Sequence, residues 1–238
     1  MFILSSLVIS AFLIISTTCF DINNVNKNIT VLKKHSYMNL NLVVSIRIQN
    51  CSVKIIEEEA FKNVSVLLLE ITDNNIKNLT NGSFAEVLFV DLILDRNEIE
   101  LIEEGTFNNI HPLWKGLLSL QKNNIETIEK GVFNGTDIRI LSLDDNQITN
   151  IQPGAFEQMH HLRILTLSKN KLRNIGVGIF QNFPGLFSLD LSENHINKID
   201  KLAFEDDKEL FLNLENNTIS TEVSKWYFEN TKIIALFK

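Results

Sequence analysis

The chain has 238 residues, of which 45% are hydrophobic and 21% are charged, and its formal net charge is −7 at pH 7. A chain of this length and composition can bury a sizeable core. Because binding to phosphate groups needs a basic stripe, the acidic balance argues against nucleic acid as a partner. A basic peptide or a basic protein surface would instead be attracted.

Residues 1–20 resemble a secretory signal peptide. They contain no charged side chain, and an apolar run from Leu7 to Ile15 is followed by small residues. This run is shorter than a membrane span requires. We expect cleavage after Thr18 or Cys19 and a secreted, extracellular product, with a retained membrane anchor as the alternative.

Residues 21–42 do not fit the pattern that follows them, and we expect them to form an N-terminal cap. The segment Ile29–Leu32 is the candidate for a capping strand. The mature chain has at most two cysteines, Cys19 and Cys51, so disulfides are not its main source of stability. A bridge between them is conceivable, although we expect Cys51 to be buried.

One spacing of apolar residues and an asparagine recurs along residues 43–228. Leu141 and Leu143 alternate as in a short strand with one buried face, and Asn146 and Phe156 follow. The asparagine position falls on Cys51, Asn74, Asn97, Asn123, Asn146, Asn170, Asn194 and Asn217. The phenylalanine position falls on Phe61, Phe84, Phe107, Phe133, Phe156, Phe180, Phe204 and, less regularly, Phe228. Such a period predicts a solenoid of about eight coils that share one core.

Each repeated position has a physical role. Leucines and isoleucines of successive coils would stack, and each buried side chain contributes about 1.5–3 kcal/mol. The asparagine amide can satisfy backbone groups that are left unpaired where the strand ends, so the asparagines would form a ladder along the solenoid. We expect Cys51 to be the first rung of this ladder.

The LxLxx(N/C)xL core and the IxxxxF half that follows it resemble the typical extracellular class of leucine-rich repeat proteins. The resemblance covers Val43–Phe228. It implies an α/β solenoid, a curved horseshoe with a parallel β-sheet on the concave face and irregular or 3-10 returns on the convex face. It also implies recognition of another protein by the concave face, as in Toll-like receptor ectodomains. The cysteine-rich caps that such proteins usually carry are missing.

Two segments depart from the repeat. The repeat that contains Trp114 is three residues longer than most, and we expect it to bulge outward, with this tryptophan packed against the body or forming a surface knob. Residues 229–238 are expected to form a closing strand with Ile234 and Leu236 pointing inward. Their apolar run is too short for a membrane span or a lipid-anchor tail, so we expect no stable membrane anchor.

Side chains between the buried leucines would form columns on the concave face. The column just before the first leucine contains Ser45, Leu68, Asp91, Leu117, Ile140, Ile164, Ser188 and Phe211. Its apolar members suggest a contact strip, although branched side chains also simply favour strands. The neighbouring columns are polar and lean acidic. Our candidate ligand-binding residues are Leu117, Ile140, Ile164, Asp95, Asp144, Ser168 and Asp190.

Seven asparagines match the glycosylation acceptor pattern: Asn28, Asn50, Asn63, Asn78, Asn81, Asn134 and Asn216. We expect glycans at Asn28, Asn63 and Asn134, the alternative being that an asparagine-rich chain produces such triplets by chance. The histidines are scattered, and neither a nucleophile elbow nor a phosphate loop nor a zinc pattern occurs. We therefore expect no enzyme activity, no cofactor and no metal site.

The sequence predicts a secreted leucine-rich repeat glycoprotein that binds another protein, in innate immune recognition or adhesion. Two alternatives fit the same residues. One is a secreted effector of the venom or saliva type that acts on another organism, and the other is a truncated receptor-like ectodomain. The sequence does not predict the oligomeric state.

Overall fold

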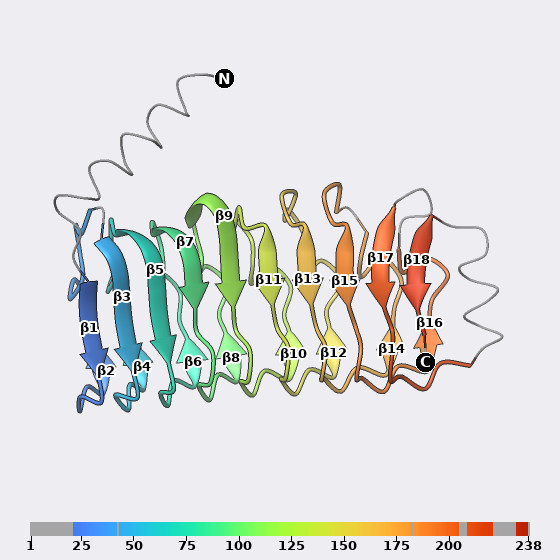
Figure 1. Cartoon of the computed structure of the whole chain (residues 1–238), viewed down its shortest axis with the longest axis horizontal. Coiled ribbons are helices and arrows are strands. Elements are labelled where there is room, and N and C mark those ends of the chain that lie inside the picture. The colour runs from blue at the N-terminus through green and yellow to red at the C-terminus, as the bar shows by residue number, and fades with distance from the viewer. Residues whose placement is uncertain (1–20, 42, 182, 205–208, 221–231, 238) are drawn as a thin grey trace, which may run out of the picture.

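The computed structural model describes residues 21–41, 43–181, 183–204, 209–220 and 232–237. The predicted signal peptide with Cys19, the side chain of Trp114 and the last phenylalanine position, Phe228, lie outside the described part. Ten parallel strands lie side by side in chain order, and short strands lie behind them (Figure 1). The predicted solenoid with its parallel sheet is confirmed.

The main sheet takes one strand from each coil. In spatial order these are β1 (Asp21–Val25), β3 (Val43–Gln49), β5 (Ser65–Thr72), β7 (Leu88–Ile93), β9 (His111–Ser119), β11 (Ile140–Ser142), β13 (Ile164–Thr166), β15 (Ser188–Asp190), β17 (Leu210–Asn213) and β18 (Ile233–Leu236). Leu141 pairs in register with Leu118 on one side and with Leu165 on the other. Equivalent leucines of successive coils therefore lie directly beside one another, as the repeat predicts.

The returns contain short strands that pair two by two. They are β2 (Val31–Leu32) with β4 (Ile55–Ile56), β6 (Asn78–Leu79) with β8 (Leu101–Ile102), β10 (Thr127–Ile128) with β12 (Asn150–Ile151), and β14 (Asn174–Ile175) with β16 (Lys198–Ile199). The helical part of the expected α/β class is wrong, because the described residues contain no helix. Most returns turn through residues with positive φ, such as Glu59, Gly105 and Gln158, and positive φ interrupts a right-handed helix.

One continuous core runs through the coils. Leu141 and Leu143 are fully buried, and so are their equivalents along the sheet. Behind them the rings of the phenylalanine position stack from coil to coil, with centroid distances from 5.2 Å at Tyr37–Phe61 to 6.3 Å at Phe156–Phe180. We call this stack the phenylalanine spine; its members are Tyr37, Phe61, Phe84, Phe107, Phe133, Phe156, Phe180 and Phe204.

Both ends of the sheet differ from the expectation. The N-terminal strand is Asp21–Val25 rather than Ile29–Leu32, and it pairs with β3 while Tyr37 occupies the phenylalanine position. The first segment is thus a complete coil. At the other end β18 does pair with β17, but it is Ile233 that is buried, whereas Ile234 and Leu236 are 56% and 55% exposed. Their predicted inward direction is wrong because the register is offset by one residue, which exchanges the two faces.

The asparagine ladder satisfies the backbone where each strand ends. Asn146 donates from Nδ2 to the carbonyl oxygens of Leu120 (2.9 Å) and Leu143 (3.1 Å), and its Oδ1 accepts from the Ile125 amide at 3.2 Å. Each ladder amide therefore links two coils inside the core. These buried backbone groups cannot reach water. The side-chain amide therefore supplies the hydrogen bonds that they lose where the strand ends.

Cys51 is the first rung of the ladder. Its side chain is fully buried, and its thiol donates to the carbonyl oxygens of Asn24 and Gln49 at 3.1 and 3.2 Å. Its backbone amide donates to Oδ1 of Asn74 at 3.0 Å. The thiol is free. Cys51 is thus held as a small core residue, as the repeat predicts.

We expect Asn146→Ala to lower the free energy of unfolding by about 1–3 kcal/mol, the cost of leaving buried backbone groups without partners. Asn150→Ala is the matched control, because Asn150 lies in the same coil and is exposed. Urea unfolding of both variants checks this. Equal midpoints would show that the ladder amide is dispensable.

Candidate functional site

The concave face, meaning the face of the main sheet turned away from the core, carries the predicted apolar strip. Ile140 pairs in register with Leu117 of β9 and with Ile164 of β13, and all three side chains are half-buried. The column continues to Phe211 and Ile234, which are both 56% exposed. The structure therefore brings the three predicted apolar residues together, while Ser188 of β15 separates them from the apolar residues of the last two strands.

Asp144 is tied into the sheet. One carboxylate oxygen accepts from the hydroxyls of Ser142 (2.9 Å) and Thr166 (2.5 Å), and the other accepts from the amide of Ser168 at 2.7 Å. Thr166 and Ser168 belong to the next coil. The carboxylate thus fastens one coil to the next. This local function competes with any role as a free ligand group.

Asp95 repeats the arrangement two coils earlier. Its Oδ1 accepts from the hydroxyl of Ser119 at 2.6 Å and from the amide of Gln121 at 2.9 Å. Burial raises the pKa of the Asp95 carboxyl above its ordinary value, and the two hydrogen bonds only partly oppose this effect. Asp190 differs, because it accepts from the Ser192 amide of its own coil at 2.9 Å.

We expect the contribution of Asp95 to stability to fall as the pH rises. Its folded pKa lies above the unfolded value of about 3.9, so the contribution is full below that pH and is lost as the pH passes through the raised pKa. Asp95→Asn keeps an Oδ1 acceptor and removes the charge. Urea unfolding at several pH values between acidic and neutral checks this. The free energy of unfolding of the variant should rise relative to that of the wild type as the pH rises. A constant difference, like that expected for the exposed Asp145→Asn control, would contradict the assignment.

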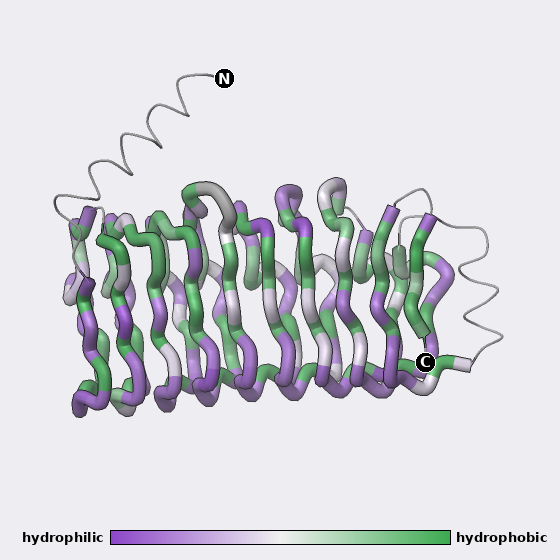
Figure 2. Tube along the Cα trace, viewed as in Figure 1, coloured by the Kyte–Doolittle hydropathy of each residue, from purple (hydrophilic) through white to green (hydrophobic). Residues whose placement is uncertain are grey.

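Ion pairs neutralise several carboxylates of the polar columns on the concave face. Arg96 contacts Asp73 through two hydrogen bonds of 2.7 and 2.9 Å, which hold the pKa of that carboxyl below its ordinary value. Arg47 and Lys169 pair in the same way with Glu70 at 3.4 Å and Glu193 at 3.7 Å. Figure 2 shows hydrophilic residues gathered along the turns at the lower edge of the sheet. The concave face is therefore less acidic in effect than its composition suggests.

Asp91 belongs to the predicted column but was not among the candidate ligand-binding residues. It lies in register between Leu68 and Leu117, so a carboxylate interrupts the apolar column. Its Oδ1 is buried, yet it has no hydrogen-bond partner among the described residues. An unpaired buried oxygen is costly, so Asp91 lowers the stability of the sheet at this point. The alternating pattern alone marks its position, but not this missing partner.

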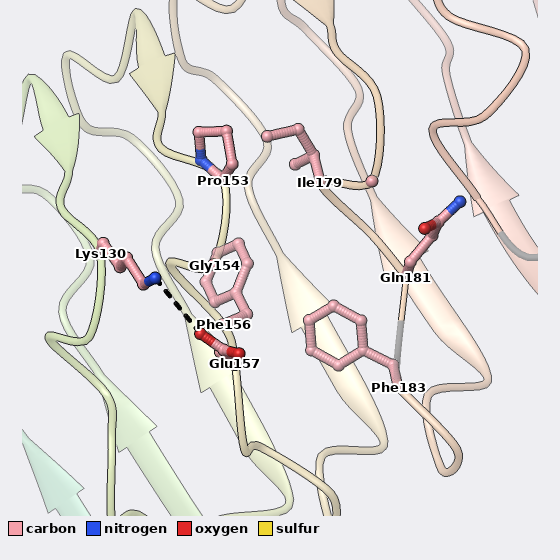
Figure 3. Close-up of a pocket in the computed structure, with 9 residues that line it drawn as sticks. Lys130, Pro153, Gly154, Phe156, Glu157, Ile179, Gln181 and Phe183 are labelled. Atoms are coloured by element: carbon pink, nitrogen blue, oxygen red, sulfur yellow. Dashed lines mark ion pairs between the residues drawn. The ribbon is translucent and has the colours of Figure 1, made fainter.

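A pocket on the opposite, convex side is lined by Lys130, Pro153, Gly154, Phe156, Glu157, Gly178, Ile179, Gln181 and Phe183 (Figure 3). Its two charged side chains pair with each other, with Lys130 Nζ 3.8 Å from Glu157 Oε2. Phe183 stands beside the phenylalanine spine, with its ring tilted 51° to that of Phe156. The pocket is a gap between returns and holds no candidate residue of the concave face.

The histidines do not converge. Lys62, Lys34 and His35 surround the partly buried Glu59, and their hydrogen bonds lower the pKa of that carboxyl to about 2. His161 pairs with Asp137 in a different coil. In the described ranges, three or more histidine, cysteine or acidic side chains nowhere gather in an arrangement that would hold a metal ion. Nor does this part of the chain contain a helix long and apolar enough to cross a membrane.

The predicted glycosylation sites differ in exposure. Asn28 and Asn63 are exposed, whereas Asn134 is half-buried and its Oδ1 is covered without a partner. The Thr136 hydroxyl of the same triplet is buried and donates to the Phe133 carbonyl at 2.6 Å. Asn28 and Asn63 therefore remain the better candidates for glycans.

Two family models match the chain. The model described as Leucine rich repeat matches residues 116–172 and 160–219, and the one described as BspA type Leucine rich repeat region (6 copies) matches residues 10–118. Their matches follow the coils described above. The chain is a leucine-rich repeat protein. No curated protein matches this leucine-rich repeat protein in sequence.

Solved leucine-rich repeat structures share the fold. Drosophila Toll, in its complex with Spatzle, superposes with a TM-score of 0.61 at 14% identity over 92% of this chain. TLR13, in its complex with ssRNA13, gives a TM-score of 0.64 at 19% identity, also over 92% of this chain. Our chain spans only 38% and 35% of the lengths of those two chains. At these identities the likeness establishes the fold alone.

Proposed function

We propose that this leucine-rich repeat protein is secreted and binds another protein through its concave face. The observation that carries the proposal is the unbroken register of Leu117, Ile140 and Ile164 on three adjacent strands. Their half-buried side chains form one apolar strip on an otherwise polar face. Apolar surface that is collected in one strip favours a contact role over mere strand preference.

The partner would present an apolar surface with a basic group beside it. The half-buried Asp91, at one end of the strip, would supply the carboxylate that pairs with a lysine or arginine of the partner. The net charge of −7 would steer a basic protein toward this leucine-rich repeat protein and would repel nucleic acid. Asp95 and Asp144 then act by holding the sheet in shape, while Asp190 lies beside the strip.

The exposed end of the strip would add anchor residues. Phe211 and Ile234 continue the column, and Leu236 lies two residues beyond Ile234 on the same face of β18. Large exposed apolar side chains next to a half-buried strip can fill pockets on a partner, which is where binding energy concentrates. The proposed contact therefore runs from β7 to β18.

Residues 1–20 and the seven glycosylation triplets support an extracellular location. The complex of Toll with Spatzle belongs to development and innate immunity and is one of a leucine-rich repeat protein with a protein ligand. This supports a role in innate immune recognition or adhesion. The TLR13 complex contains RNA, so the exclusion of nucleic acid rests on charge. We further propose that the chain has no enzyme activity.

Affinity capture from extracellular fluid tests the proposal. The bait proteins are the wild type, the strip variant Ile140→Asp with Ile164→Asp, and a control with Ile55→Asp and Val177→Asp. Ile55 and Val177 are 52% and 55% exposed and lie in the returns, away from the strip. We expect the wild type and the control to recover one protein that the strip variant loses, with equal circular dichroism for all three. Equal recovery by all three would refute the proposal.

A further inference from the structure

One side of the solenoid carries charges whose sign changes along the chain. We call it the ladder flank; it consists of the residues one and three positions after each ladder asparagine, together with Lys198 at the start of β16. Backbone hydrogen bonds hold these positions in line from coil to coil, for example Thr149 to Glu126 and Asn197 to Arg173. Glu100, Asn124, Glu126 and Gln147 also line one surface hollow. The ladder flank is thus one continuous surface.

The charges on the ladder flank are arranged around the β11 coil. The two preceding coils, which follow β7 and β9, contribute Glu98, Glu100 and Glu126. The β11 coil contributes only Gln147 and Thr149, which are uncharged. The two following coils contribute Lys171, Arg173 and Lys198, with His195 between them. Carboxylates therefore occupy the two coils on one side of a neutral centre, and cations occupy the two coils on the other side.

This order makes the ladder flank complementary to a reversed copy of itself. A two-fold axis that crosses the flank along the β11 coil reverses the order of the coils and keeps each position in its own column. It sets Glu126 opposite the partner copy's position 173, Glu98 opposite position 195 and Glu100 opposite position 197, which is next to Lys198. Each contact then occurs twice, as an isologous interface requires. We propose that two copies of this protein associate in antiparallel fashion through the ladder flank.

The cations on this surface are free to take a partner. Lys171, Arg173 and Lys198 are exposed, and none of the ion pairs in the described part of the chain includes them. Glu126 is likewise outside those ion pairs. Glu100 does contact Lys77 at 3.3 Å, but both side chains are more than half exposed, and such a pair contributes little. The contacts between two copies would therefore replace only a weak ion pair within one copy.

The glycosylation triplets leave the ladder flank open between Glu98 and Lys198. Asn28, Asn50 and Asn78 lie in earlier coils, Asn216 lies in a later one, and the other three belong to the returns. Five coils spaced by about 4.8 Å span about 24 Å, which matches the width of a standard interface of about 800 Å² per partner. Exposed charge pairs dominate this surface, so we expect the dimer to weaken as salt is raised.

Sedimentation velocity on the full chain, over a range of concentrations and salt, tests the proposal through charge reversal. The variants are Glu126→Arg, Arg173→Glu, the two combined in one chain, and Arg139→Glu as a control on an exposed arginine outside the flank. We expect each single flank reversal to raise the dimer dissociation constant at least about tenfold, because it sets like charges opposite each other. An equal mixture of the two single variants should form a heterodimer, and the combined variant should dimerise as the wild type does.

Three results would overturn the inference. The wild type could remain monomeric at every concentration, the single reversals could match the Arg139→Glu control, or the mixture could fail to restore association. Heparin is the probe for a competing role. If a monomeric wild type bound heparin and only Arg173→Glu lost that binding, the basic coils would serve a sulfated polymer instead. Dimerisation and heparin binding can both be tested independently of the concave strip, because the ladder flank and the strip lie on different faces.

Discussion

Phe133→Ala should lower the free energy of unfolding by about 3–5 kcal/mol, the usual cost of truncating a buried phenylalanine. Phe133 is 1% exposed, and its ring stacks between those of Phe107 at 6.1 Å and Phe156 at 6.0 Å. Removing it interrupts the phenylalanine spine in the middle of the molecule. Because each coil contacts only its neighbours, we expect the two halves to uncouple and the urea transition to broaden.

Phe187→Ala is the control for this prediction, since Phe187 is 47% exposed and lies outside the spine. Its expected cost is below 1 kcal/mol, as for surface substitutions generally (about ±0.5 kcal/mol). Urea unfolding followed by circular dichroism distinguishes the two. A cost for Phe133→Ala no larger than that for Phe187→Ala would show that the stacked rings do not join the coils.

Leu141→Asp should abolish folding, whereas Ile140→Asp should leave the fold intact. Leu141 is fully buried between Leu118 and Leu165, so the substitution removes an apolar side chain and places an unpaired carboxylate in the core. The combined cost is at least about 5 kcal/mol, as large as the whole stability of many domains. Ile140 is its neighbour in the same strand, but it points to the concave face.

Circular dichroism and limited proteolysis of the two purified variants check this prediction. We expect a native spectrum and protease resistance for Ile140→Asp only. If both variants folded, the core position of Leu141 would be wrong. If neither folded, Ile140 would be part of the core rather than of a binding surface.

The repeat made most of the fold predictable. Leu141, Asn146 and Phe156 follow from side-chain alternation and a fixed period, which depend on local sequence alone. That the described residues contain no helix was not predictable in this way, because residues such as Glu59 and Gln158 adopt positive φ without being glycine. The inward residues of β18 were also missed, since no ladder asparagine follows that strand to fix its register.

The candidate site was predictable in outline only. The column of Leu117, Ile140 and Ile164 came directly from counting, because parallel coils in register place equal positions side by side. The fastening role of Asp95 and Asp144 depends on hydroxyls and amides one coil later, about a full repeat away in sequence. A search for a serine or threonine near that distance from each aspartate would have indicated it.

Thiol labelling of single-cysteine variants tests the alternation of faces most directly. The substitutions are Ile140→Cys, Leu141→Cys, Ile164→Cys and Leu165→Cys in a background with Cys19→Ala and Cys51→Ala, each labelled in the native state and in urea. We predict that the cysteines at 140 and 164 react in the native protein, while those at 141 and 165 react only after unfolding. Equal native reactivity at neighbouring positions would contradict both the shared core and the concave strip.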